Sequence, residues 1–199
     1  MNKPDLLRQI ADAAYNVGFG AKKHFATYDL VEKSPGWIGI ISIAVGIFAL
    51  LIDALATKVV SAGFLVLGLT TFYIGSYNES KNEYEEKGKL LTKLFDELKA
   101  LYFRIKTLEK EDFSNEAEAL YSIQSRYHDA TISKQVFLSD WYAHYKFFWQ
   151  HQIEWIDEQK HFRFWRDKLP LSFLLFLLSC FAGIALFLFS LYFQCKGGI

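Results

Sequence analysis

Three long stretches of the chain contain no charged residue, and they decide the solvent in which it folds. Residues 34–52, 59–78 and 169–195 cover 19, 20 and 27 positions without Asp, Glu, Lys or Arg. As helices that rise about 1.5 Å per residue they reach about 28, 30 and 40 Å, and the hydrocarbon core of a bilayer is about 30 Å thick. Backbone in lipid must satisfy its own N–H and C=O groups, which favours helices. The sequence therefore predicts an all-α membrane protein that crosses the bilayer three times.

The charge-free stretches divide the chain into four predicted parts. The first is a cytoplasmic N-terminal amphipathic helical segment, and the second is a transmembrane helical hairpin. The third is a long cytoplasmic helical stalk with a bundle of aromatic-rich helices, and the fourth is a third, C-terminal transmembrane helix. In this order the parts are residues 1–33, 34–78 (spans about 36–53 and 59–77), 79–168 and 169–195.

Basic residues are distributed unevenly about the ends of the spans. Eleven Lys and Arg residues lie near the spans on the side of the N-terminus and of residues 79–168, but only Lys58 and Lys196 lie on the other side. Lys and Arg near span ends are retained in the cytoplasm, so we expect a cytoplasmic N-terminus and an external C-terminus. The totals of 22 Lys+Arg and 22 Asp+Glu indicate neither an acidic nor a basic partner.

Both spans of the hairpin carry small residues at helical spacing, which lets helices approach closely in lipid. Two interpretations remain open. The small faces pack within one hairpin, or they pack between copies of the chain, with Ser42, Ser61 and Thr71 lining a narrow aqueous path. No ionisable group lies inside these spans, which argues against a proton relay. The candidate pore-lining or helix-packing residues are Gly39, Ser42, Gly46, Ser61, Gly68, Thr71 and Gly75.

The third span differs from the hairpin in composition. It is rich in Leu and Phe, and only Gly183, with Ala182 and Ala185 beside it, offers a patch for close helix contact. Pro170 at its start suits the first turn of a helix. We therefore expect a lipid-facing anchor.

A seven-residue apolar repeat follows the second span and is typical of a coiled coil. We predict one helix from about residue 59 to residue 110, which leaves the membrane as a stalk. Its apolar stripe packs either against another helix of the same chain or against copies of the chain. The two layers of the repeat are Tyr84, Leu91, Leu98 and Ile105, and Leu94, Leu101 and Leu108.

Four of the five Trp residues fall within residues 131–168, interleaved with Lys, His and Arg. Interleaved aromatics and cations can stack bases and hold phosphates, and they also suit a helix in the lipid headgroup layer. We favour the membrane interpretation for residues 160–168, and core packing ahead of a ligand pocket for residues 141–149. The side chains predicted to pack on the stalk from one helical face are Trp141, Tyr145, Phe148 and Trp155. The candidate nucleotide-binding residues are Trp141, Tyr145, Lys146, Trp149, Arg163 and Arg166.

Two His/Glu pairs raise the question of a metal site. His151 and Glu154, and Glu158 and His161, stand three residues apart. Di-iron bundles use such pairs on two helices, with further Glu residues from two others. Here both pairs are predicted on one helix, so we favour a solvated face and expect no metal or cofactor. Residues 16–23 contain two glycines but lack the spacing of a phosphate-binding loop, and we expect them to pack closely under the hairpin.

Three marks give the chain a family resemblance. The first is Gly-Ala-Lys-Lys-His-Phe at residues 20–25, shortly before Pro-Gly-Trp at residues 35–37. The second is the tight hairpin that runs into a long helix. The third is an aromatic segment that begins Asp-Trp-Tyr-Ala-His-Tyr at residues 140–145 and contains Trp-Ile-Asp at residues 155–157. Over about residues 10–160 the chain resembles the SLATT domain family, two-span effectors associated with SMODS nucleotidyltransferases and SLOG proteins in bacterial conflict systems.

The resemblance implies an effector of anti-phage defence by abortive infection. Such effectors oligomerise into ion-conducting pores that depolarise the bacterial inner membrane. The implied partners are the lipid bilayer, further copies of the chain in a homo-oligomer such as a tetramer, and a nucleotide or oligonucleotide made by a cognate nucleotidyltransferase. The resemblance supplies no set of ligand residues, and the segment at residues 169–195 departs from the two-span pattern.

Two other functions compete with the pore. One is a membrane-bound metalloenzyme that would use the two His/Glu pairs, and the other is a passive membrane scaffold that recruits cytoplasmic partners through the stalk. No Ser/His/Asp or Cys/His set with a supporting motif occurs in the sequence. We therefore expect a protein that is not an enzyme.

Overall fold

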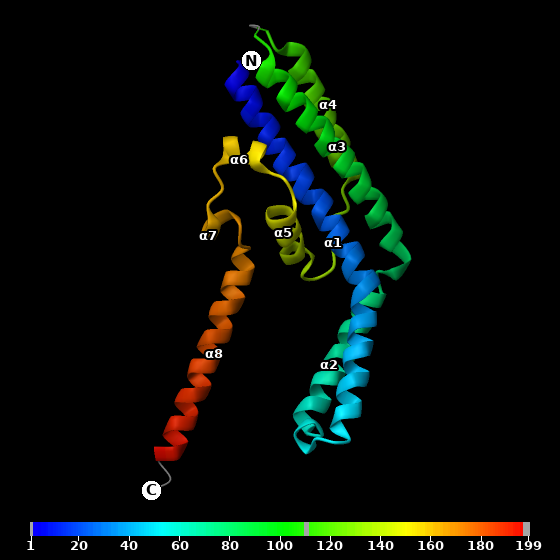
Figure 1. Ribbon diagram of the computed structural model, residues 1–199, viewed down its shortest axis with the longest axis vertical. Coiled ribbons are helices and arrows are strands. Elements are labelled where there is room, and N and C mark those ends of the chain that lie inside the picture. Colours follow the sequence, from blue (N-terminus) through cyan, green and yellow to red (C-terminus); the bar gives the residue numbers. More distant parts are fainter. Residues whose placement is uncertain (1, 110–111, 197–199) are drawn as a thin grey trace. The chain divides into compact units, whose positions relative to one another are not determined.

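The computed structural model describes residues 2–109 and 112–196, with the backbone alone at residues 187 and 190–196. These residues form helices and loops, and the described ranges contain no strand. The chain divides into two compact units, Met1–Lys160 and His161–Ile199. The helices of the first unit are α1 (Lys3–Ala49), α2 (Lys58–Gly75), α3 (Lys81–Thr107), α4 (Ser114–Ala130), α5 (Ser139–Gln150) and α6 (Glu154–Lys160), with the 3₁₀ turns η1 (Asp53–Leu55) and η2 (Asn78–Ser80) (Figure 1).

Helix α1 is continuous and joins the N-terminal segment to the first span. Asn2 caps it by accepting a hydrogen bond from the Asp5 N–H at 2.9 Å, and Pro4 stands in the first turn, where a missing N–H costs nothing. Pro35 lies inside the helix, where a proline removes one backbone hydrogen bond. Figure 1 shows α1 changing direction between its upper and lower halves.

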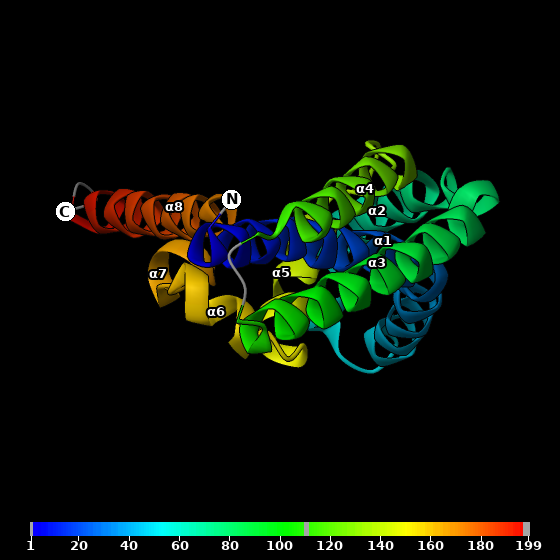
Figure 2. The same cartoon turned by 90° about the horizontal axis from the view of Figure 1, so that it is seen from above.

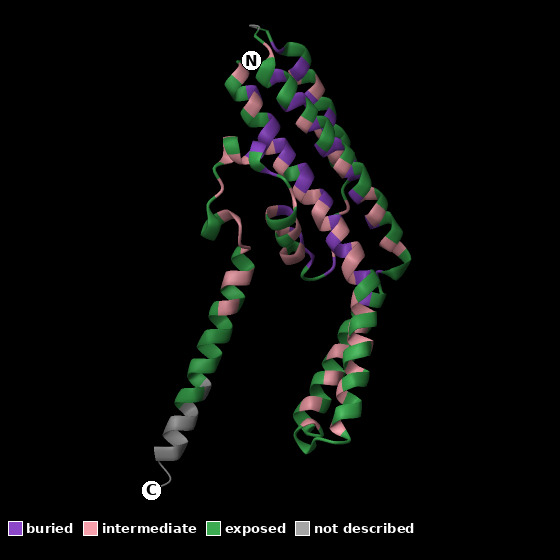
Figure 3. Ribbon diagram, in the orientation of Figure 1, coloured by how far each residue is buried: buried purple, intermediate pink, exposed green. Residues whose placement is uncertain are grey.

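Burial along α1 shows where the bundle ends and the hairpin begins. The buried residues of α1 run from Leu6 to Val31, and residues 32–49 include none. Figure 3 shows the same change along the ribbon, from purple in the upper half to green and pink in the lower half. The first part of α1 is therefore a core helix of the bundle, and the second part is exposed.

Helix α3 packs antiparallel against the first part of α1 (Figures 1 and 2). The apolar repeat forms this contact: Tyr84, Leu91, Leu98 and Ile105 are each at most 3% exposed. This result confirms the interpretation in which the stripe packs against a helix of its own chain. Burial of each large side chain stabilises the fold by about 1.5–3 kcal/mol.

Two glycines let aromatic rings approach the backbone of α1 and α3. A Cβ at Gly18 would lie 2.8 Å from the Phe95 ring and 2.9 Å from the Phe147 ring. A Cβ at Gly88 would lie 3.1 Å from the Phe25 ring. Residues 16–23 are therefore a closely packed part of a helix, and the elements they contact include α3, α4 and α5.

The second span and the stalk are not one helix, which corrects the prediction of a continuous helix over residues 59–110. Helix α2 ends at Gly75 and α3 begins at Lys81, with η2 between them. The Ser76 hydroxyl donates to the Tyr73 C=O at 2.7 Å, and the Tyr77 N–H bonds the Ile74 C=O three residues back. Serine hydroxyls compete in this way for backbone groups that would continue a helix.

Residues 34–49 of α1 and helix α2 form an antiparallel hairpin (Figure 1). Thr57 caps α2 by accepting a hydrogen bond from the Val60 N–H at 3.4 Å. The most apolar 18-residue window of each helix is only 6% buried. The core helix of a soluble protein is mostly buried, whereas these helices expose their apolar side chains and are long enough to cross a membrane.

Helix α4 returns along α3 (Figures 1 and 2). Leu120 and Ile123 are buried in this contact. The Arg126 guanidinium donates to both carboxylate oxygens of Glu97, at 2.8 and 2.6 Å. Because an exposed ion pair contributes at most about 1 kcal/mol, the apolar side chains supply most of the attraction between the two helices.

The aromatic segment forms two helices, α5 and α6, instead of one. The chain is extended at His151, which follows α5, so Trp155 on α6 does not share a face with Trp141. The buried face of α5 consists of Ser139, Ala143 and Phe147. The predicted face is therefore wrong for Tyr145, which is 51% exposed, although Trp155 does pack on α3, 5.6 Å from the Phe95 ring and 5.0 Å from the Tyr102 ring.

The second unit contains α7 (Phe164–Asp167) and α8 (Leu171–Lys196). The Pro170 C=O accepts the first hydrogen bond of α8, from the Phe173 N–H at 3.0 Å. The segment at residues 169–195 is thus helical and apolar, and its crossing of the membrane stays a prediction. Its side chains at residues 187 and 190–195 lie outside those described.

The close contact at Gly18 generates a stability prediction. The change Gly18→Val places methyl groups where the Phe95 and Phe147 rings lie, and overpacking of this kind costs about 1–3 kcal/mol. The apparent melting temperature in detergent should fall by about 2–4 °C for each kcal/mol. The matched control is Gly39→Val on the same helix, where a Cβ meets no atom within 4 Å. Equal melting temperatures for the two variants would contradict this account of the core.

Candidate functional site

An extended segment ties the bundle to the base of the hairpin. Residues 131–137, here called the strap, run between α4 and α5 without helical structure. Backbone N–H and C=O groups without partners are costly when buried, and side chains from α1, α2, α3 and the α2–α3 connection supply those partners. The bonds are Ile132 N–H to His24 Nε2 (3.1 Å), Tyr84 Oη to Lys134 C=O (2.6 Å), Tyr77 Oη to Gln135 C=O (3.4 Å) and Phe137 N–H to Tyr73 Oη (3.3 Å).

Apolar contacts fix the strap at the same place. Val136 is 3% exposed and belongs to a cluster with Val31 of α1, Ile74 of α2 and Tyr84 of α3. The Gln135 side chain adds a second link, since its Oε1 accepts from the Thr27 hydroxyl at 2.5 Å and its Nε2 donates to the Ile132 C=O at 2.7 Å. The strap therefore contacts both helices of the hairpin and the first turn of α3.

His24 has one tautomer, and its hydrogen-bond partners determine it. Its Nδ1–H donates to the Gly20 C=O at 2.7 Å, and its Nε2 accepts from the Ile132 N–H. A carbonyl only accepts and a backbone N–H only donates, so the ring is neutral. Burial lowers the pKa of His24. Lys23 and Lys87 lower this pKa further, whereas the Gly20 carbonyl and Glu83 oppose the shift.

The motif at residues 20–25 has a structural explanation. A Cβ at Gly20 would lie 3.2 Å from the Tyr127 ring, so this glycine lets α4 approach α1 closely. His24 holds the strap, Phe25 packs against Gly88 of α3 and Lys23 pairs with Asp140 of α5 at 2.8 Å. The motif thus connects α1 to α3, α4, α5 and the strap.

Asp29 of α1 is the main ionic contact between α1 and α5. Lys146 of α5 pairs with it, and both side chains are about 15% exposed. Lys33 pairs with the same carboxylate at 2.6 Å. Burial alone would raise the pKa of Asp29, but the hydrogen bonds from Lys146 and Lys33 outweigh burial and lower it. The Asp29–Lys146 ion pair therefore holds α5 against α1 while Asp29 is ionised.

The candidate pore-lining residues lie on the exposed hairpin. A Cβ at Gly39 or Gly46 of α1, or at Gly68 or Gly75 of α2, would meet no atom within 4 Å. Their faces are thus not occupied within one protomer. The hydroxyls in α2 bond to their own helix, Ser61 to the Thr57 C=O at 3.2 Å and Thr71 to the Leu67 C=O at 2.9 Å. Ser42 lies on α1 and is partly exposed.

Three of the six candidate ligand residues share one side of α5. Trp141, Tyr145 and Trp149 recur every four residues, and Tyr145 and Trp149 are 51% and 60% exposed. Lys146 instead points into the contact with Asp29, and its Nζ lies 4.6 Å from the centre of the Tyr142 ring. Helix α5 therefore presents an aromatic stripe in which Tyr145 and Trp149 are exposed and Trp141 is partly buried, and the neighbouring Lys146 is already paired with Asp29.

The remaining candidate residues fall in the second unit. Arg163 and Arg166 flank and enter α7, where the Arg166 Nε donates to Asp167 at 3.0 Å. The structure thus does not bring these two arginines together with α5 in one unit.

The His/Glu pairs do not form the predicted helical pattern. His151 follows α5 and His161 follows α6 with φ of 51°, so the four residues are not on one helix. Glu158 accepts hydrogen bonds from Tyr102 at 3.0 Å and Lys106 at 2.7 Å. Within the described part of the chain, no three His, Cys, Asp or Glu side chains gather in a way that could hold a metal ion.

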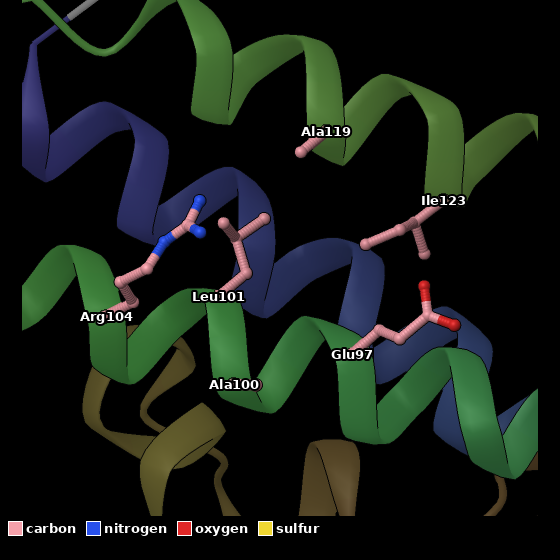
Figure 4. Close-up of a pocket in the computed structure, with 6 residues that line it drawn as sticks. All are labelled: Glu97, Ala100, Leu101, Arg104, Ala119 and Ile123. Carbon is pink, nitrogen blue, oxygen red and sulfur yellow. The ribbon is translucent and has the colours of Figure 1, made fainter.

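A groove of about 280 Å³ lies between α3 and α4 (Figure 4). Its floor is apolar, and its rim charges are paired: Glu97 with Arg126, and Arg104 with Glu116 at 3.7 Å. None of the candidate ligand residues lines it. The residues that line it are Glu97, Ala100, Leu101, Arg104, Ala119 and Ile123.

Sequence reasoning missed the strap and its partners. The β-branched residues Thr131, Ile132 and Val136 favour extended backbone, and this signal could have separated the strap from the helices that follow. The tyrosine hydroxyls that hold the strap carry no local signal, because Tyr77 bonds a carbonyl 58 residues away.

The neutral His24 generates a prediction of pH dependence. The pKa values of His24, His144 and His151 are all lowered by burial, that of His151 to about 4. Below about pH 6.5 the unfolded chain binds protons that the folded chain does not, so stability falls as the pH falls from 7 to 5. Each histidine contributes at most about 1.4 kcal/mol per pH unit.

The variant His24→Gln isolates the contribution of this residue, because an amide oxygen can still accept from the Ile132 N–H but does not titrate. The melting temperature should depend less on pH in His24→Gln than in the wild type, whereas His24→Leu should already be less stable at pH 7. If the pH dependence is the same in His24→Gln and the wild type, His24 does not contribute to the loss of stability at low pH.

The comparison with known families agrees with this architecture. The family described as SMODS and SLOG-associating 2TM effector domain 6, one of the SLATT families, matches residues 1–177. No curated protein and no solved structure matches the chain. The match includes both exposed apolar helices of the hairpin, the bundle and the strap, and it confirms the resemblance of the chain to the SLATT domain family. The chain therefore belongs to the SLATT family of SMODS and SLOG-associating two-transmembrane effector domains.

Proposed function

We propose that the chain is a pore-forming effector of bacterial anti-phage defence. Copies assemble in the inner membrane with residues 1–33 and 79–168 in the cytoplasm, and their hairpins together surround an ion path. A nucleotide or oligonucleotide from a cognate nucleotidyltransferase controls the path, and conduction depolarises the membrane on infection. Membership of a family of two-transmembrane effectors supports the effector role.

The main support for a pore comes from glycines on the hairpin whose surroundings are empty in one protomer. Gly39, Gly46, Gly68 and Gly75, on the small-residue faces, have open space where a Cβ would lie, as do Gly36 and Gly63. Glycine inside a helix costs about 1 kcal/mol relative to alanine, and its benefit in lipid is the close approach of another helix. A single hairpin cannot enclose a path, so these faces are best used between copies.

Hydroxyl groups give the proposed path its polar lining. Ser61 and Thr71 donate their protons to carbonyls of α2, which satisfies the donors inside the protomer. Each hydroxyl oxygen keeps acceptor capacity that can face water or a cation. In a lone protomer the hydroxyl protons are already bonded when the side chains face lipid. After assembly the hydroxyl oxygens can accept hydrogen bonds from water in the path.

Control of the pore follows from the connections of α5. Its aromatic stripe of Trp141, Tyr145 and Trp149 can stack bases, and a phosphate near Lys146 competes with Asp29 for the ammonium group. Loss of the Asp29–Lys146 pair loosens α5 from α1, and the strap carries the change to the end of α2. The ligand shifts gating only as far as it binds the open and closed states unequally. Arg163 and Arg166 remain candidates for further phosphate contacts.

Ion flux from liposomes tests the pore. The purified wild type, assayed with each candidate nucleotide, should release ions. Gly68→Val should reduce the flux because it blocks approach on the small-residue face. The matched control is Gly63→Val, since Gly63 is equally open in the protomer but lies on another side of α2. Flux equal to that of empty liposomes under every condition would count against the pore and favour a passive scaffold.

Nucleotide binding tests the stripe on α5. Removal of a ring that stacks on a base costs about 1–3 kcal/mol, so Trp149→Ala and Tyr145→Ala should each weaken binding by about 5- to 150-fold in calorimetry. The control is Tyr121→Ala on α4, because Tyr121 is 74% exposed and lies outside the stripe. Equal affinities in all three variants would place the ligand elsewhere.

A further inference from the structure

The strap ends in a tight turn of unusual composition. The Ser139 N–H bonds the Val136 C=O at 3.0 Å, so Phe137 and Leu138 are the two central residues of the turn. Leu138 has φ of 70° and ψ of −2°, and Phe137 has a negative φ. These angles describe a type II turn, whose third position favours Gly or Asn because side chains with a Cβ are strained there.

Both residues at the tip of this turn are bulky, apolar and exposed. Phe137 is 73% exposed and Leu138 is 40% exposed. Turns usually place Gly, Asn, Asp or Ser at such positions. The turn therefore combines a strained backbone with two apolar side chains exposed to solvent. Both features are unfavourable unless another surface contacts the turn.

The tip of the turn lies level with the end of the second span. The Phe137 N–H donates to the Oη of Tyr73, which belongs to the last turn of α2. The Tyr73 Oη also lies 3.3 Å from the Oη of Tyr77, which follows the C-terminal end of α2. Tyr73 is 42% exposed and Trp37, near the start of the charge-free part of α1, is 64% exposed.

Exposed aromatic rings at the ends of membrane spans are typical of the lipid headgroup level. Phe137 lies beside one such ring. The charged residues that flank the turn are Lys134, whose Nζ lies 4.8 Å from the centre of the Tyr77 ring, and Asp140, whose charge is paired with Lys23 at 2.8 Å. A basic residue at this level attracts anionic headgroups. The surroundings of the turn thus suit a lipid surface.

We propose that the turn at Phe137 and Leu138 inserts into the headgroup–acyl boundary of the leaflet in which α2 ends. The bilayer then supplies the contact that compensates for the exposed side chains and the strained backbone. The strap becomes bonded to the hairpin through Tyr73 and anchored in lipid through its tip. This inference rests on the hairpin crossing the membrane and is independent of ion conduction.

Site-specific labelling tests the insertion. In full-length protein with Cys180→Ser and Cys195→Ser, the variants Phe137→Cys and Leu138→Cys are each labelled with an environment-sensitive fluorophore and reconstituted in phosphatidylcholine vesicles. A fraction of the lipid carries a nitroxide quencher high on the acyl chain. The control is Tyr121→Cys on α4, where the side chain is 74% exposed. Melting temperatures in detergent verify that each labelled protein is folded.

Insertion predicts a blue-shifted emission at residues 137 and 138 and a loss of fluorescence when nitroxide lipid is included, with no such loss at residue 121. Quenching at 137 and 138 no greater than at 121 overturns the proposal. In that case quenching by aqueous iodide at 137 indicates a turn in water, and protection from iodide indicates a turn covered by a second copy of the chain. The fluorescence measurement does not depend on ion conduction. A failed insertion can therefore be distinguished from a failure of the proposed pore.

Discussion

Helix α1 is shared by the bundle and the hairpin, and this covalent constraint underlies the rest of the structure. Its first part is buried from Leu6 to Val31, and its second part is exposed and apolar. The close approach at Gly18, where two aromatic rings contact the helix backbone, fixes the orientation of the buried part. Any rotation of this part must therefore be accommodated by the hairpin that continues it.

Helix α2 does not continue into the bundle as one helix, and the strap supplies the contacts that hold its end against the bundle. Ser76 and the residues of η2 end the helical hydrogen bonding between α2 and α3. In exchange, Tyr73 and Tyr77 bond the backbone of the strap, and His24 bonds its other end. Besides the covalent connection through η2, the hairpin is thus joined to the bundle by one continuous helix and by the hydrogen bonds and apolar contacts of the strap.

The sequence predicted those features that depend on local periodicity. The charge-free stretches and the seven-residue repeat gave the exposed hairpin and the buried face of α3, because both depend on residues close together in the chain. The face of α5 was wrong because small residues, Ser139 and Ala143, form the actual contact together with Phe147. A hydrophobicity pattern gives no reason to place small residues inside and Tyr145 outside.

The strap could not be found in this way, since its partners are far away in the chain. The Ile132 N–H and His24 are 108 residues apart, and no spacing rule connects them. Of the candidate ligand residues on α5, Trp141, Tyr145 and Trp149 share one side of the helix, whereas Lys146 is engaged with Asp29. Their role in binding a ligand stays a prediction. Ion pairs between distant helices decide which cations remain available to a ligand.

Pro35 gives this arrangement a mechanical consequence. It leaves one hydrogen bond out of α1 close to the point where burial ends, so bending costs less there than in the rest of the helix. On the N-terminal side of Pro35, Ile132 and Gln135 of the strap bond His24 and Thr27 of α1. At the other end of the strap, Phe137 bonds Tyr73 of α2. Opening of the joint would pull these bonds apart, so the strap opposes wide opening for as long as they are kept.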